Sequence, residues 1–218
     1  MSTARKNPPQ AFLYTQLQIS VPFAEVPWRE LNEGIREAPG FLNKTWLAGV
    51  GTRSVGGFYA FDSLDHARGF ALEAFPIEAR RFGVAQTSRL FDAAATQEAS
   101  EAMRSVHFGA APPERVEAYV YTEVQVGLPR FNDGPWRTLN PELLAQPGLL
   151  SKTWLYGANN GTAGGIYAFE SVDEAKAFCV DYFPTEARKL GAAYTTRMFD
   201  ATLTRDASRA MRSPFFAS

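Results

Sequence analysis

The chain reads GFLNKTWL at residues 40–47 and GGFYAF at residues 56–61, and this pair of segments occurs twice. The second copy reads GLLSKTWL at residues 148–155 and GGIYAF at residues 164–169. Each copy has the length and composition of two β-strands joined by a short connection. Both segments are displaced by the same 108 residues (154 minus 46, and 167 minus 59). A constant displacement predicts a tandem duplication of one folding unit.

The residues around each copy predict the element order β-α-β-β-α-β followed by a terminal helix. Residues 11–20 alternate between two sets of side chains, which is typical of a strand. Residues 28–37 have helical spacing and are stopped by a Pro-Gly pair, and Ser63 is a suitable N-cap for the next helix. A fourth strand is expected at residues 84–92, and an alanine-rich helix at residues 93–103. This is the order of a ferredoxin-like unit.

One face of each expected sheet has no helix to cover it, because right-handed crossovers place both helices on the same face. If the aliphatic set with Leu13 and Leu17 lies under the helices, Phe12 and Tyr14 lie on the bare face. An aromatic face of that size needs a partner. We therefore expect an α+β fold in which two ferredoxin-like repeats pack their antiparallel sheets face to face, as an intrachain dimeric α+β barrel.

This interpretation divides the chain into four parts. We expect a disordered leader at residues 1–10, a first repeat at 11–104, a linker at 105–117 and a second repeat at 118–218. The two repeats would form a pseudo-dimer within one chain, and a further homodimer remains open.

Composition limits the classes of function. The net charge is −1 and no basic cluster is present, so neither nucleic acid nor a membrane surface is expected as a partner. No apolar run is long enough to span a bilayer, and the N-terminal segment lacks a signal peptide, so we expect a cytoplasmic protein. Cys179 is the single cysteine, and neither His66 nor His107 sits in a cluster of ligand residues, so no metal site is expected. The two Gly-Gly pairs precede strand residues, which favours tight hairpin geometry over phosphate binding.

The motifs resemble those of the YdhR-type mono-oxygenase family. The resemblance rests on Pro-Gly-x-Leu-x-Lys-x-Trp, on Gly-Gly-x-Tyr-Ala-Phe and on a last strand that ends Arg-x-Phe-Asp, and it covers each half nearly end to end. This family belongs to the dimeric α+β barrel superfamily, which includes cofactor-independent antibiotic-biosynthesis mono-oxygenases. The family ordinarily has one repeat per chain, so this chain departs from it by carrying two. The resemblance implies a cofactor-independent mono-oxygenase whose partners are dioxygen and an aromatic or polyketide-like small molecule.

Such chemistry requires an apolar cavity, a proton acceptor and a cation near the developing negative charge. Each half offers one set of residues of these types. The candidate catalytic residues are Lys44, Tyr59 and Arg89, with their counterparts Lys152, Tyr167 and Arg197. The candidate substrate-binding residues are Tyr14, Trp46, Tyr121 and Trp154.

Structural roles compete with each of these assignments. Trp46 and Tyr59 also suit barrel packing, Lys44 can extend its stem over the sheet rim, and Arg89 can pair with a carboxylate such as Glu78. Two other functions remain open on the same barrel. One is a non-catalytic small-molecule binding protein, and the other is a cyclase, isomerase or lyase. The residues also leave open whether the site lies inside the barrel or between sheet and helices.

Overall fold

The computed structural model describes residues 7–216, and in this part of the chain two four-stranded antiparallel sheets are formed. The first has the order β2-β3-β1-β4 and the second the order β6-β7-β5-β8. The strands of the first sheet are β1 (Ala11–Gln18), β2 (Phe41–Ala48), β3 (Ser54–Phe61) and β4 (Gln86–Asp92). Those of the second are β5 (Ala118–Val124), β6 (Leu149–Tyr156), β7 (Ala163–Phe169) and β8 (Tyr194–Asp200).

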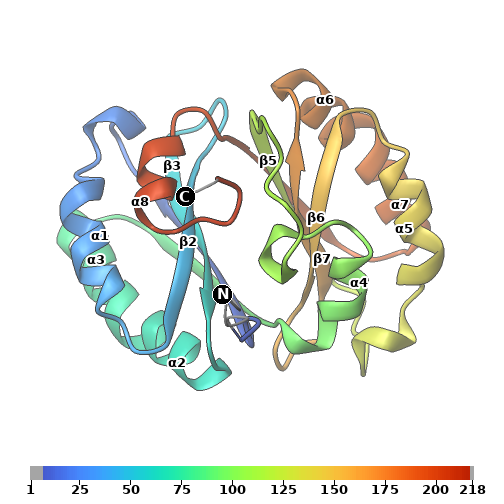
Figure 1. Ribbon diagram of the computed structural model, residues 1–218, viewed down its shortest axis with the longest axis horizontal. Coiled ribbons are helices and arrows are strands. Elements are labelled where there is room, and N and C mark those ends of the chain that lie inside the picture. Colours follow the sequence, from blue (N-terminus) through green and yellow to red (C-terminus); the bar gives the residue numbers. More distant parts are fainter. Residues whose placement is uncertain (1–6, 217–218) are drawn as a thin grey trace, which may run out of the picture.

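Helices cover the outer face of each sheet, and the two bare faces meet in the middle of the molecule (Figure 1). The helices of the first half are η1 (Phe23–Glu25), α1 (Trp28–Arg36), α2 (Leu64–Gly69), η2 (Phe70–Ala74), α3 (Phe75–Phe82), η3 (Ala94–Thr96), α4 (Gln97–Glu101) and η4 (Val106–Phe108). Those of the second are η5 (Phe131–Asp133), α5 (Trp136–Leu144), α6 (Val172–Ala177), η6 (Phe178–Tyr182), α7 (Phe183–Lys189) and α8 (Arg205–Ala210). No described helix is long and apolar enough to cross a membrane.

The predicted division of the β1 side chains between two faces is confirmed. Leu13 and Leu17 pack with Phe70 in the core between the first sheet and its helices. Phe12 and Tyr14 belong to a separate core between the two sheets. The fold is therefore the expected α+β arrangement of two ferredoxin-like βαββαβ units, packed face to face as an intrachain dimeric α+β barrel.

The two sheets are joined at their edges by backbone pairing. Gly49, just after β2, pairs with Phe199 in β8, and Gly157, just after β6, pairs with Phe91 in β4. The amide of Val50 also donates to the carbonyl oxygen of Met198, at 2.9 Å. These contacts close the barrel at one end of each seam.

The terminal helices cross over to the opposite half. Figure 1 shows α8, the last helix, beside β2 and α1, whereas α4 of the first half lies beside β6. The amide of Lys44 donates to the carbonyl oxygen of Met211 at 3.1 Å, and that of Lys152 donates to Met103 at 3.0 Å. The edge strands β2 and β6 are thus each covered by a segment from the other half.

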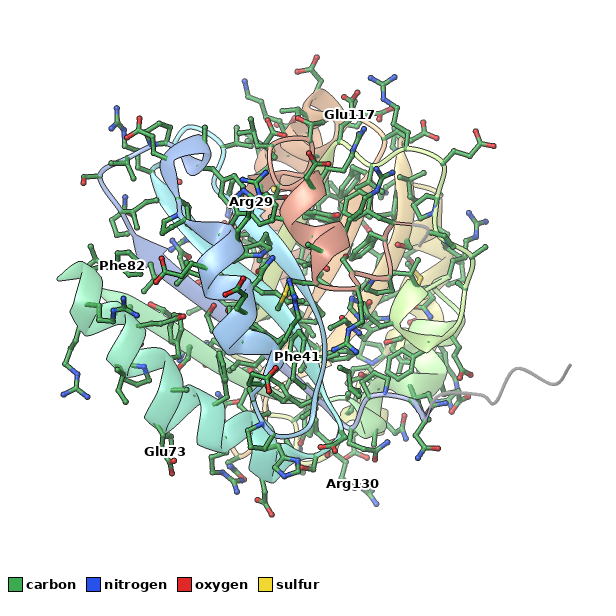
Figure 2. The ribbon with its side chains drawn as sticks, turned by 60° about the vertical axis from the view of Figure 1, so that its left-hand side comes forward. Arg29, Phe41, Glu73, Phe82, Glu117 and Arg130 are labelled. Atoms are coloured by element: carbon green, nitrogen blue, oxygen red, sulfur yellow. The ribbon has the colours of Figure 1, made fainter. Side chains whose placement is uncertain are left out.

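Several local details differ from the expected elements. The terminal helix expected at residues 93–103 is a 3-10 turn followed by the short α4. A π-helical turn, η2, joins α2 and α3 into one continuous helical segment, and Pro76 stands in the first turn of α3, where a proline needs no backbone donor. Figure 2 shows Glu73 of the π-helical turn pointing away from the molecule.

Residues 1–6 of the expected leader lie outside the described part of the chain. Gln10, at the end of that leader, forms backbone hydrogen bonds with both Phe61 and Ala93.

Candidate functional site

The described residues form three cavities that contain predicted site residues. One lies between the sheets and has a volume of about 340 Å³. A second, of about 240 Å³, lies between the first sheet and its helices. The third, of about 290 Å³, is its counterpart in the second half. We call these the central cavity, the first lateral cavity and the second lateral cavity.

The second lateral cavity contains a lysine amine among aromatic and aliphatic groups. Lys152 projects from β6, and its Nζ lies 2.7 Å from the ring centroid of Trp154 and 4.8 Å from that of Tyr167. The apolar lining includes Val124, Leu128, Phe131, Leu139 and Leu143. An amine in such surroundings faces aromatic π-electrons and carbon atoms in place of water.

Burial changes the acid–base behaviour of Lys152. The residue is 1% exposed, and no hydrogen bond or ion pair joins its Nζ to another side chain within residues 7–216. Desolvation lowers the pKa of Lys152 well below its ordinary value, because the cavity disfavours the charged ammonium. Burial also raises the pKa of Tyr167, so its hydroxyl keeps its proton. Lys152 is thus suited to accept a proton, and Tyr167 to donate a hydrogen bond.

The first lateral cavity has the same lysine–tryptophan pair but a different electrostatic environment. Lys44 Nζ lies 2.9 Å from the ring centroid of Trp46. Burial lowers the pKa of Lys44, and the charge of Glu78, which lines the same cavity, opposes that shift. Burial in turn raises the pKa of Glu78. The amine in this cavity therefore has an acidic neighbour.

Glu186 lines the second lateral cavity, but it bonds to another lysine and forms no ion pair with Lys152 in the described structure. Glu186 occupies the position of Glu78 in the second half (186 minus 78 is 108), but its Oε1 accepts a hydrogen bond from Lys189 Nζ at 2.6 Å. The counterpart of Lys189 in the first half is Arg81, which instead pairs with Glu30 at 3.7 Å. The two lateral cavities are therefore chemically different.

Residues that the sequence reasoning missed hold both tryptophans in place. Trp46 Nε1 donates to Asn32 Oδ1 at 2.9 Å, and its amide donates to Ser208 Oγ at 2.9 Å. The same arrangement holds Trp154, whose partners are Asn140 at 2.8 Å and Ser100 at 2.9 Å. The serine in each case comes from the terminal helix of the other half. The repeated spacing of Asn and Trp (46 minus 32 and 154 minus 140 are both 14) is a sequence signal for this contact.

The Gly-Gly pairs, for which the sequence predicted a role in tight hairpin geometry, lie in the strands of the two hairpins. Both pairs lie within strands, β3 and β7, and away from their connections. A Cβ atom at Gly165 would lie 2.6 Å from Cε of Lys152, and one at Gly57 would lie 2.5 Å from Cε of Lys44. A Cβ at Gly164 would collide with the backbone of Thr122 on the adjacent strand. These glycines make room for the lysine stems and for close strand approach.

The central cavity has polar groups around two stacked tyrosines. The rings of Tyr14 and Tyr121 are parallel, with centroids 4.1 Å apart. Arg89 Nε lies 3.2 Å from Glu123 Oε2, and the hydroxyl of Tyr121 donates to the same oxygen at 2.6 Å. Arg89 therefore pairs across the barrel with Glu123 of the other half, and the expected pairing with Glu78 is not formed.

The structure divides the predicted site residues among different cavities. Lysine, tryptophan and tyrosine come together in each lateral cavity, as Lys152, Trp154 and Tyr167 show. Tyr14, Tyr121, Arg89 and Arg197 lie on the opposite sheet faces and line the central cavity. The reason is strand register, because Tyr59 pairs with Leu13 whereas Arg89 pairs with Tyr14. Within the described residues, no group of three His, Cys, Asp or Glu side chains is placed to hold a metal ion.

Comparison with known proteins agrees with the fold and with the resemblance stated from the sequence. Residues 133–205 match the family model described as "Putative mono-oxygenase ydhR". This match, inside the second half, confirms the resemblance to the YdhR-type family. No curated protein sequence matches the chain.

Solved structures share the fold at low sequence identity. The crystal structure of an "anthrone oxidase-like protein" is 16% identical, with a TM-score of 0.60, and the match covers 89% of this chain and 92% of that one. A "putative monooxygenase" from Fusobacterium nucleatum is 8% identical with a TM-score of 0.51, covering 89% and 93%. A chlorite dismutase from Candidatus Nitrospira defluvii is 8% identical with a TM-score of 0.52, covering 94% and 97%. Since the barrel is shared by proteins with different descriptions, the reaction must be argued from the site.

Proposed function

We propose that the protein is a cofactor-independent mono-oxygenase for an aromatic or polyketide-like small molecule, with the second lateral cavity as its reaction site. The observation that carries the proposal is the buried amine of Lys152. It lies against Trp154 in a mostly apolar cavity and forms no ion pair within residues 7–216, since Glu186, which lines the same cavity, bonds to Lys189. The family match in the same half and the fold shared with an anthrone oxidase-like protein support it.

The amine supplies the base that such a reaction needs. Lys152 takes a proton from a phenol, enol or activated methylene group, and the ammonium then stabilises the resulting anion in a cavity from which water is largely excluded. An electron-rich carbanion or enolate can pass an electron to dioxygen. For a methylene substrate, R₂CH₂ and O₂ give R₂C=O and H₂O, so one oxygen atom enters the product and the other leaves as water. Trp154 provides a flat wall for a planar substrate.

Oxygen consumption with a panel of anthrones and hydroquinones tests this proposal. The unaltered chain should consume oxygen faster than the spontaneous reaction. Lys152→Met should lower kcat by about 100-fold or more, the range for loss of a general base. Lys44→Met is the matched control, because it removes the equivalent lysine beside Glu78, and it should retain most of the activity. No uptake above the spontaneous rate across the panel, or equal loss in both variants, would contradict the proposal.

A base-catalysed reaction without oxygen is the second candidate, and the same amine favours it. A cyclase, isomerase or lyase also begins by removing a proton from carbon next to a carbonyl group. Conversion of substrate under nitrogen at the rate seen in air would favour this class. Ligand-induced thermal stabilisation with no turnover in either atmosphere would instead favour a binding protein.

A further inference from the structure

We propose that Lys152 forms a reversible imine with uncharged aromatic aldehydes and ketones that enter the second lateral cavity. This covalent carbonyl capture is an activity separate from oxygenation, because it requires neither dioxygen nor proton removal from the substrate carbon. It would allow the chain to bind, or to activate, a class of carbonyl compounds that the proposed oxygenase reaction does not need.

The position of the amine suits attack on a bound carbonyl group. Lys152 Nζ lies at the cavity wall, next to the faces of Trp154 and Tyr167, and makes no hydrogen bond or ion pair in the described structure. Its nitrogen lone pair is thus not engaged by an acidic group. Gly165 keeps open the space around the lysine stem, where any larger residue would place an atom 2.6 Å from Cε. The amine is therefore both unpaired and held in a defined position.

The environment favours the neutral amine, which is the form that attacks carbonyl carbon. Glu186 lines the same cavity, but its carboxylate accepts a hydrogen bond from Lys189 at 2.6 Å and forms no ion pair with Lys152 in the described structure. Desolvation then favours the uncharged form, the same effect that makes buried lysines form Schiff bases. The nitrogen adds to the carbonyl carbon, a proton moves from nitrogen to oxygen, and water leaves. The balance is R₂C=O plus lysine amine giving the imine plus H₂O, with no oxidant or reductant.

The cavity lining defines the class of carbonyl compound. Leu128, Leu139 and Leu143 contribute aliphatic surface, and Trp154 and Phe131 contribute aromatic faces. Such walls bind flat apolar rings. The volume of about 290 Å³ suits a substrate of one or two fused rings.

Reductive trapping on the full chain tests the proposal directly. The protein is incubated at pH 7 with benzaldehyde and cyanoborohydride, and the modified lysines are located by peptide mass mapping. We expect the adduct at Lys152 to exceed that at Lys44 and at the exposed Lys176 by about tenfold or more, because burial without an ion-pair partner favours the neutral amine at Lys152. Lys44 is an internal control, because it lies in an equivalent cavity beside Glu78.

Two variants separate this result from indirect effects. Glu78→Gln removes the acidic neighbour of Lys44 and should raise trapping at Lys44 toward the level at Lys152. Lys152→Met should abolish the adduct at that position while a thermal melt confirms that the chain is folded. Trapping at Lys152 no greater than at Lys176 would overturn the proposal. The outcome is independent of oxygen uptake, so failure here and failure of the oxygenase proposal are distinguishable.

Discussion

At the scale of the residue, Gly165 shows how the site is accommodated within the sheet. A Cβ atom there would lie 2.6 Å from Cε of Lys152 and 3.0 Å from Cε2 of Tyr167. We expect Gly165→Ala to lower the free energy of unfolding by about 1–3 kcal/mol, as overpacking of a filled core does. Urea denaturation followed by tryptophan fluorescence measures the change.

A double-mutant cycle identifies the cause of this effect. If Lys152 is the group that collides, Gly165→Ala should cost less in a Lys152→Ala background than in the unaltered chain. Gly34→Ala is the matched control, because Gly34 lies inside α1 and a Cβ atom there would meet nothing within 4 Å. This control should stabilise the chain by about 0.5–1 kcal/mol. Strictly additive effects of the Gly165 and Lys152 substitutions would contradict the interpretation.

His107 is a second residue whose environment only the structure shows. Its ring lies edge-on to Phe12, Phe58 and Phe215, with centroids 5.2, 5.2 and 5.6 Å away, and neither ring nitrogen has a hydrogen-bond partner in the described residues. His107→Phe should therefore raise the free energy of unfolding at pH 7 by about 1–3 kcal/mol, because it removes two buried polar atoms that have no partner.

The same residue predicts a pH dependence. Burial lowers the pKa of His107 to about 3 from an ordinary value of 6.5. The unfolded chain thus binds a proton that the folded chain does not, so stability is lost as the pH falls from 6.5 toward 3, by up to about 1.4 kcal/mol per pH unit. His107→Phe should remove this contribution, whereas His66→Gln on the surface should not. Urea denaturation midpoints at pH 7 and pH 5 check the result. An equal fall in the midpoint between these two pH values in His107→Phe and in the unaltered chain would contradict it.

At the scale of the element, the exchanged terminal helices make each half depend on the other. The hydroxyl oxygen of Ser208 in α8 accepts a hydrogen bond from the backbone amide of Trp46 in β2. In the same way, Ser100 in α4 accepts one from the amide of Trp154 in β6. Ser208→Ala leaves a buried strand amide unpaired, so we expect a loss of about 1–3 kcal/mol. Hydrogen exchange should become faster in β2, although the substitution lies in the second half of the sequence.

The reciprocal substitution provides the control for this prediction. Ser100→Ala should speed exchange in β6 and leave β2 unchanged, and Ser20→Ala on the surface should alter neither strand. Faster exchange in the half that carries the substitution, with no change in the opposite half, would contradict the proposed dependence.

At the scale of the whole molecule, the aromatic faces of the two sheets pack against each other, and the segments around His107 and Phe215 fill part of the core between them. Phe12 and Tyr14 pack against Tyr119 and Tyr121 in the core between the sheets. Separate chains of residues 1–110 and 111–218 should therefore be insoluble or self-associate, because each would expose this face and lack its covering helix. Size-exclusion chromatography measures the outcome, and co-expression should restore a one-to-one complex. Two soluble monomeric halves would contradict the prediction.

The sequence alone determined the element order and the division of each sheet into two faces. Alternation along β1 is a local property of the backbone, so Leu13 could be assigned to the helix side and Tyr14 to the inter-sheet side before any contact was known. The constant displacement of the Lys-x-Trp and Gly-Gly segments indicated two similar units. The same spacing placed Lys44 and Trp46 on one strand face, and the structure brings them together.

The tertiary structure decided which groups meet across the halves. Arg89 pairs with Glu123, and Ser100 with Trp154, through contacts between residues far apart in the chain that no local periodicity encodes. It also decided that the lateral cavities differ, because Glu186 bonds to Lys189 and leaves Lys152 unpaired within residues 7–216. The charge state of a buried amine depends on the position of its nearest carboxylate in space, and this position is a property of the packed molecule.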